Sequence, residues 1–174
     1  MFSTPRKSMP ALEHLSPVRS VSDHRRALLL GAVVCIFGTV ACAIKTGSPI
    51  YWIIVAAFVL LTAYRHIDMT LFRRVVVEPT DVEAAAHWEL RATYGAAAWA
   101  TIAGIWCFVS FAIVRDPATE IIAMVATIGC LVGIVARNFG LDRMLTVQLA
   151  IVAGFVSAGL FLRDDPYHWV LAAF

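Results

Sequence analysis

Five long apolar segments restrict what this chain can fold into more than any other feature. The segments cover residues 27–44, 50–64, 92–114, 119–136 and 144–162. Glu120 is the one charged residue in them, and they contain no histidine. Apolar runs of roughly 17–25 residues are typical of transmembrane helices. The second and fourth segments are short, but polar neighbours such as Ser48 and Thr119 can lie in the headgroup region. The pattern predicts five membrane-spanning helices.

The composition excludes a large water-soluble domain. Of the 174 residues, 60% are hydrophobic and 15% are charged, whereas about a quarter of the residues are charged in a soluble domain. Residues 1–26 precede the first segment, and the prolines, serines and threonines there are typical of a disordered tail. The sequence therefore predicts an all-α, polytopic transmembrane helix bundle over residues 27–174.

A sixth apolar run, "YHWVLAAF", occupies residues 167–174. Eight helical residues rise about 12 Å, whereas the hydrocarbon core is about 30 Å thick. A helix that stops in mid-bilayer leaves its last carbonyl groups without partners. We therefore expect this segment to be an incomplete sixth span of a chain that continues. A short re-entrant or interfacial end is the alternative.

The first apolar segment has features of a cleaved signal peptide, because basic residues precede it and "ACA" at residues 41–43 resembles a cleavage site. Against cleavage, the preceding leader is long and contains Glu13 and Asp23. A lipoprotein site at Cys42 is disfavoured by Thr39. We interpret the segment as a retained span.

All four cysteines lie within apolar segments and none has C-x-x-C spacing, so they are expected to pack as small hydrophobic residues. They predict neither a disulfide framework nor a metal site. The formal net charge of +2 gives no indication of a nucleic-acid partner. The expected partner is the lipid bilayer.

The basic residues predict the orientation of the chain. Eleven of the 14 Lys and Arg residues lie in the tail and in the connections that follow the second and fourth segments. The alternate connections contain Lys45, Arg115 and Arg163. Cytoplasmic loops are enriched in Lys and Arg. We therefore expect a cytoplasmic N-terminus, a cytoplasmic connection over residues 65–91, and a tight cytoplasmic turn at "RNFGLDR".

Polar and small residues within the segments bear on packing. Glu120 follows Pro117 and is expected in the first turn of a helix, where the dipole favours a carboxylate; a proton relay is the alternative. Gln148 is expected to hydrogen-bond a neighbouring helix. Gly129 and Gly133 form a G-x-x-x-G motif, which permits close helix packing either within the bundle or between two copies in a homodimer.

The sequence contains no recognisable catalytic or nucleotide-binding motif: Walker A, H-E-x-x-H and G-x-S-x-G are all absent. No cofactor or metal is expected. A membrane haem requires imidazoles within the spans, and all five histidines lie outside the predicted ones. Tyr167, His168 and Trp169 form an aromatic group after "RDDP". It is interpreted either as a site for a small outer ligand or as part of an interfacial aromatic belt.

Three motifs occur together after the second segment. They are W-E-x-R-x-x-x-G (Trp88, Glu89, Arg91, Gly95), R-N-x-G-x-x-R (Arg137, Asn138, Gly140, Arg143) and D-P-Y-H (Asp165, Pro166, Tyr167, His168). With these motifs, residues 65–174 resemble the membrane-spanning N-terminal region of bacterial cyclic-di-GMP signalling proteins of the alphaproteobacterial type. Those proteins carry GGDEF and often EAL domains after the last helix.

The resemblance implies a multi-pass module of the bacterial inner membrane, joined through its sixth helix to a cytoplasmic diguanylate cyclase or phosphodiesterase. These 174 residues contain neither GGDEF nor EAL, so catalysis would reside in a following domain. The module would anchor that enzyme in the membrane. It would also act as its sensor, passing a signal to it through a change in helix packing or dimer geometry. The resemblance assigns no ligand-binding residue.

Three other functions fit the same pattern. A small transporter or channel predicts polar residues within spans and broken helices near mid-membrane, and the sequence offers few of either. The membrane sensor of a histidine kinase would have a similar bundle. A purely structural anchor would bind no ligand.

Overall fold

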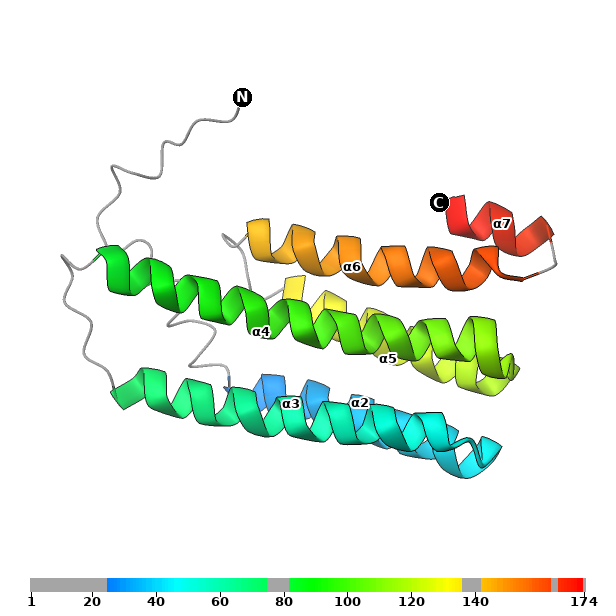
Figure 1. The fold of residues 1–174 in the computed structure, drawn as a ribbon, viewed down its shortest axis with the longest axis horizontal. Coiled ribbons are helices and arrows are strands. Elements are labelled where there is room, and N and C mark those ends of the chain that lie inside the picture. Colours follow the sequence, from blue (N-terminus) through cyan, green and yellow to red (C-terminus); the bar gives the residue numbers. More distant parts are fainter. Residues whose placement is uncertain (1–24, 75–81, 136–141, 164–165, 174) are drawn as a thin grey trace.

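The computed structural model describes residues 25–74, 82–135, 142–163 and 166–173, and these residues form helices joined by short turns (Figure 1). No strand occurs in these ranges, which confirms the all-α prediction for them. The helices are α2 (Arg25–Thr46), α3 (Pro49–Arg74), α4 (Val82–Phe108), the π-helix η2 (Val109–Val114), α5 (Pro117–Val135), α6 (Asp142–Phe161) and α7 (Pro166–Ala173). The predicted tail lies outside the described residues.

Four helices are long and apolar enough to cross a membrane. Their apolar parts are Leu29–Thr46, Pro49–Leu71, Leu90–Val114 and Met144–Phe161. The apolar part of α5, Pro117–Gly133, is shorter, and α7 contains eight residues. The structure thus gives four candidate spans, whereas the count of five complete spans and an incomplete sixth stays a prediction.

One predicted span boundary differs from the end of the helix that contains it. The second span was expected to end at Tyr64, but α3 continues to Arg74, and α4 begins at Val82. Much of the predicted connection 65–91 is therefore helical. As a result Arg65, His66 and Asp68 lie inside the apolar part of α3, contrary to the expectation that no histidine lies within a span. The charges do not end the helix because α4 runs beside it and supplies Arg91 to pair with Asp68.

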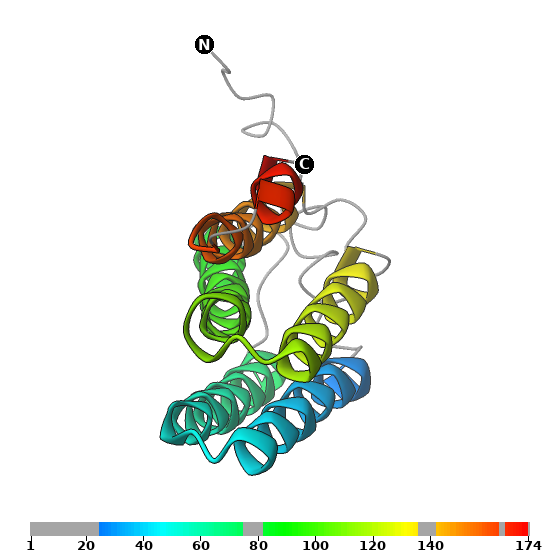
Figure 2. The same ribbon diagram turned by 90° about the vertical axis from the view of Figure 1, so that its right-hand side faces the viewer.

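Consecutive helices are antiparallel, whereas α4 and α6, which pack against each other, run in the same direction (Figure 1). Viewed along their axes, α2 and α3 form one layer, α4 and α5 lie over it, and α6 and α7 lie on the far side of α4 (Figure 2). The turns at Gly47, Asp116 and Arg163 share one end, which we call the Asp116 end (Figure 1). The opposite end, where α3 ends and α4 begins, is called the Arg65 end.

Aromatic and small side chains fill the interior. Tyr51, Phe58 and Trp106 are fully buried, and the rings of Phe58 and Trp106 meet edge to face at 6.0 Å. Many large apolar side chains face outward instead, including Leu30, Phe37, Leu60, Ile121 and Val132. Such extensive apolar surface is unfavourable in water but suits a lipid environment.

Helices α4 and α6 approach closely at glycines. A Cβ atom on Gly104 would lie 2.6 Å from Phe155 Cδ2, and one on Gly159 would lie 3.3 Å from Phe108 Cα. Gln148 on α6 is buried, and its Nε2 donates a hydrogen bond to the carbonyl oxygen of Ala96 on α4 at 3.2 Å. The predicted inter-helix hydrogen bond of Gln148 is therefore confirmed.

Two residues with positive φ form the turns at the Asp116 end. Gly47 has a φ of 66° directly after α2, where glycine adopts the left-handed conformation without strain. Arg115 has a φ of 57° after η2, and its N–H bonds the carbonyl oxygen of Ser110 at 2.9 Å. Pro117 then occupies the first position of α5, where proline needs no N–H partner.

Candidate functional site

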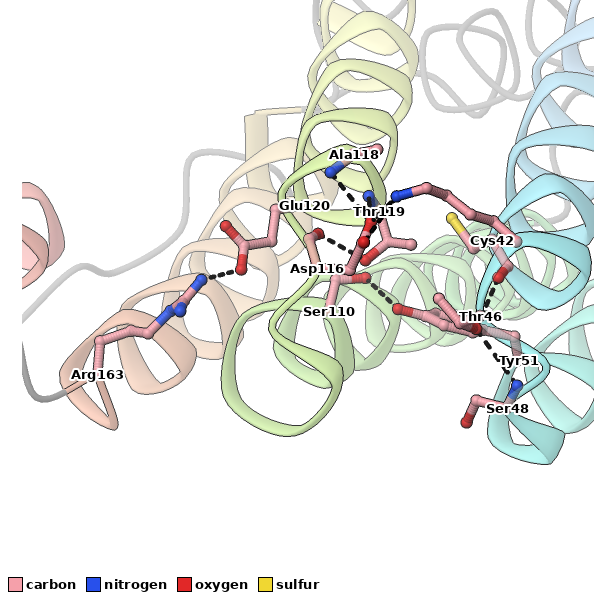
Figure 3. Close-up of polar contacts among 11 residues, drawn as sticks. Cys42, Thr46, Ser48, Tyr51, Ser110, Asp116, Ala118, Thr119, Glu120 and Arg163 are labelled. Atoms are coloured by element: carbon pink, nitrogen blue, oxygen red, sulfur yellow. Dashed lines mark hydrogen bonds and ion pairs between the residues drawn. The ribbon is translucent and has the colours of Figure 1, made fainter.

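Asp116 connects helices at the end of the bundle where the turns meet (Figure 3). Its Oδ1 accepts hydrogen bonds from the N–H groups of Ala118 and Thr119, at 3.1 and 3.0 Å, and so caps α5. Lys45 Nζ lies 2.6 Å from both carboxylate oxygens. The Lys45 hydrogen bond, aided by the Thr119 N–H, lowers the pKa of Asp116. The carboxylate thus joins α2 to α5.

A second ion pair joins α5 to the segment after α6. Glu120 lies in the first turn of α5, as predicted, and pairs with Arg163 (Figure 3). Arg115 Nη2 donates to the carbonyl oxygen of Leu162 at 3.1 Å, across the same two segments. Trp169 Nε1 of α7 donates to the carbonyl oxygen of Arg163 at 2.8 Å. Arg163 therefore contacts both α5 and α7.

Two buried hydroxyl groups lie below these ion pairs. Tyr51 on α3 and Ser110 on η2 are both fully buried, with 3.1 Å between their oxygens (Figure 3). Ser110 Oγ donates to the carbonyl oxygen of Trp106 at 3.0 Å, so the Tyr51 hydroxyl is the donor to Ser110. π-Helical turns are frequent at functional sites; here η2 presents Ser110 to α3.

A cavity of about 500 Å³ lies near the Arg65 end, between α2, α3 and α5, with Trp99 of α4 in its wall. Most of its lining is apolar. Thr62, Arg65 and His66 supply the polar side chains, and all three lie on α3. The volume falls within the range of roughly 300–1,000 Å³ that is typical of small-molecule sites.

Arg65 is the polar side chain that distinguishes this cavity. Its side chain passes over Gly95 of α4, where a Cβ atom would lie 3.3 Å from Arg65 Nε. Asp68, one turn along α3, exerts an attractive field on Arg65 but lies 2.5 Å from Arg91 Nη2. Among the described residues, Arg65 makes no hydrogen bond and no ion pair.

Two cysteines meet beside the same cavity. Cys35 Sγ on α2 and Cys130 Sγ on α5 are 3.6 Å apart, and Cys130 is also part of the lining. Like the other two cysteines, they lie within helices and form no disulfide in the described structure. They pack α2 against α5, as expected of small hydrophobic residues.

The structure describes part of the predicted landmark motifs. Arg91 pairs with Asp68, and its guanidinium carbon lies 5.0 Å from the ring centroid of Trp88. Gly95 lies under Arg65. In α7, Tyr167 is exposed and His168 is partly exposed. Pro166 begins α7, Arg143 lies in α6 and Glu89 in α4. Arg137, Asn138, Gly140 and Asp165 lie outside the described residues.

Gly129 and Gly133 both line the cavity. A Cβ atom on Gly129 would meet nothing within 4 Å, so this glycine leaves space open in the described structure. The prediction that the G-x-x-x-G motif serves helix packing stays a prediction.

Comparison of the chain with protein-family models, with curated proteins and with solved structures gives no match. The candidate functional features of the described residues are the ion pairs at the Asp116 end and the cavity at the Arg65 end.

Proposed function

We propose that this chain is the membrane-anchoring and sensory module of a bacterial cyclic-di-GMP signalling protein, spanning the inner membrane several times. The four apolar helices support the membrane location. The three motifs that include Trp88, Arg137 and Asp165 support the signalling role through their resemblance to such proteins. In this proposal α5 and α7 are also spans, and the Arg65 end faces the cytoplasm.

The observation that carries the proposal is the direction of α7. This helix begins at the Asp116 end and runs back along α6 (Figure 1). Its residue Ala172 packs against the buried core. A chain that continues from α7 in this direction reaches the Arg65 end, where most of the basic residues of the described ranges lie. GTP and cyclic-di-GMP are cytoplasmic, so an enzyme joined there has access to both.

The contacts of Arg163 suggest how a signal would reach that enzyme. Arg163 pairs with Glu120 at the start of α5 and accepts a hydrogen bond from Trp169 of α7 through its carbonyl oxygen. A change in the position of α5 would therefore alter the start of α7. In the proposed mechanism, α7 transmits this change as a shift in the geometry of two facing cyclase domains in a dimer.

The test begins with the gene beyond the codon for Phe174, which we expect to encode a GGDEF domain, an EAL domain or both. The encoded full-length protein should form cyclic-di-GMP from GTP, or hydrolyse it, in membrane vesicles. Arg163→Gln should change that activity several-fold, because it removes the ion pair with Glu120 that joins the start of α7 to α5. Gly154→Ala, on an open face of α6, is the control and should leave it unchanged. A stop codon, or a following domain of another class, would refute the proposal.

The same vesicles test the alternative of a histidine-kinase sensor. Incubation with radiolabelled ATP would label a kinase on histidine, and we expect no label. A substrate gradient across the vesicles that the protein dissipates would favour the transporter or channel instead.

A further inference from the structure

We propose that the cavity at the Arg65 end binds an anionic phospholipid, with one acyl chain in the cavity and the phosphate against Arg65. This inference is independent of the signalling role, because it concerns the bundle alone. It would hold equally for an anchor or a transporter.

The cavity is accessible from the surrounding lipid. Leu30 and Val34 of α2 and Val125 of α5 line it, yet the side chains of all three are exposed on the outer surface. The cavity therefore opens between α2 and α5 on a face that is apolar. An acyl chain can enter sideways through this opening without crossing a polar layer, whereas a water-soluble ligand cannot.

The depth of Arg65 suits a phosphate group. Arg65 lies six residues before Leu71, the end of the apolar part of α3, which corresponds to about 9 Å of helical rise. The Asp68–Arg91 pair and Trp88 lie one turn or more nearer that end, and tryptophan and arginine collect at the headgroup level. Arg65 therefore lies just below the level of the headgroups.

No acidic side chain lies beside Arg65 among the residues that line the cavity. Among the described side chains at this end, Asp68 is the acidic residue, and it is 2.5 Å from Arg91. Arg65 then remains a cation without a hydrogen-bonded or ion-paired partner in the described structure. A guanidinium at a largely apolar cavity favours an anion, and its planar donors match phosphate oxygens two at a time. A zwitterionic lipid provides the same phosphate but adds a positive group, so an anionic lipid is favoured.

Two glycines provide the space for the Arg65 side chain and for the acyl chain. Gly95 lets the Arg65 side chain cross α4, since a Cβ there would lie 3.3 Å from Nε. Gly129 leaves the cavity open, since nothing lies within 4 Å of the position of its missing Cβ. Larger residues at these two positions would displace the guanidinium and fill the space for the acyl chain, respectively.

The experiment is native mass spectrometry of the purified protein in mild detergent, titrated with dioleoyl phosphatidylglycerol or dioleoyl phosphatidylcholine. We expect the wild type to bind phosphatidylglycerol roughly tenfold more tightly, because the choline cation of phosphatidylcholine is repelled by Arg65. Arg65→Gln should abolish this preference. Lys45→Gln, which removes an exposed cation at the Asp116 end, should retain it. Equal binding of the two lipids by the wild type would overturn the proposal.

Cavity occupancy is tested separately. Gly129→Leu should weaken phosphatidylglycerol binding, whereas Gly154→Leu, also at a glycine with open space around it but outside the cavity, should not. Brominated phosphatidylglycerol should quench the fluorescence of Trp99, which lines the cavity. The quenched component is identified as the part of the emission that is missing in Trp99→Phe. This measurement does not depend on the leucine variants. Unquenched Trp99, or full displacement of the lipid by excess inorganic phosphate, would show that no acyl chain occupies the cavity.

Discussion

The carboxylate of Asp116 makes two kinds of contact. Its Oδ1 caps α5, and both of its oxygens face Lys45. Substitution by asparagine keeps a side-chain acceptor for the cap and removes the charge, whereas alanine removes both. The two variants therefore separate the ion pair from the cap.

We predict that Asp116→Asn destabilises the protein at neutral pH but not in acid. The pKa of Asp116 is lowered in the folded protein by Lys45, so the ionised carboxylate stabilises the fold at pH values above the ordinary aspartate pKa of about 4. This contribution is lost as the pH falls through the lowered folded pKa. Thermal unfolding in detergent at several pH values measures it.

Lys45→Gln should reproduce the pH dependence of Asp116→Asn, and Asp116→Ala should lower Tm further at every pH because the cap is also lost. A difference between wild type and Asp116→Asn that persists unchanged in strong acid would contradict the assignment.

Arg65 shows what the sequence leaves undetermined at the scale of single residues. Its charge, with His66 and Asp68 nearby, predicted the end of a span, because charged side chains are costly in lipid. Helix α3 continues past these residues because the cost is relieved by α4, through Arg91 opposite Asp68 and the space above Gly95. The four-residue spacing of Arg91 and Gly95 was visible in the sequence, but their position opposite α3 was not.

At the scale of helices, the apolar segments predicted most of the positions. Helices α2, α5 and α6 begin or end within two residues of the predicted segment boundaries at 44, 136, 144 and 162, because lipid-facing residues must be apolar throughout a span. The cavity could not be predicted, since it depends on how α2, α3 and α5 diverge. Gly129 and Gly133 suggested close packing, yet both line this space.

We predict that Gly104→Ala destabilises the pairing of α4 with α6. The new methyl group would lie 2.6 Å from Phe155 Cδ2 and 2.9 Å from its Cβ, so the helices must separate or Phe155 must move. Overpacking of this kind costs about 1–3 kcal/mol. Denaturant unfolding in mixed micelles gives the change in free energy of unfolding.

Gly154→Ala is the matched control, because that position has nothing within 4 Å of the new atom. The double variant Gly104→Ala with Phe155→Leu should recover part of the loss. If Gly104→Ala were as stable as Gly154→Ala, the close approach of α4 and α6 at this site would be disproved.

For the whole molecule, we predict that the Arg65 end faces the cytoplasm. Green fluorescent protein fused after Arg74 should fluoresce, whereas alkaline phosphatase fused there should be inactive. Fusions after Asp116 should give the opposite result, because Lys45, Arg115 and Arg163 are the basic residues of that side. Active phosphatase after Arg74 would reverse the proposed topology.

The ion pairs at the Asp116 end also join each hairpin of the bundle to the hairpin that is synthesised before it. The chain forms three successive hairpins, α2 with α3, α4 with α5, and α6 with α7. Lys45 belongs to the first and meets Asp116 of the second, whereas Glu120 of the second meets Arg163 of the third. During synthesis, each hairpin after the first thus brings a charged residue whose partner lies in a hairpin that has already been made. A chain that lacks the third hairpin leaves Glu120 without Arg163.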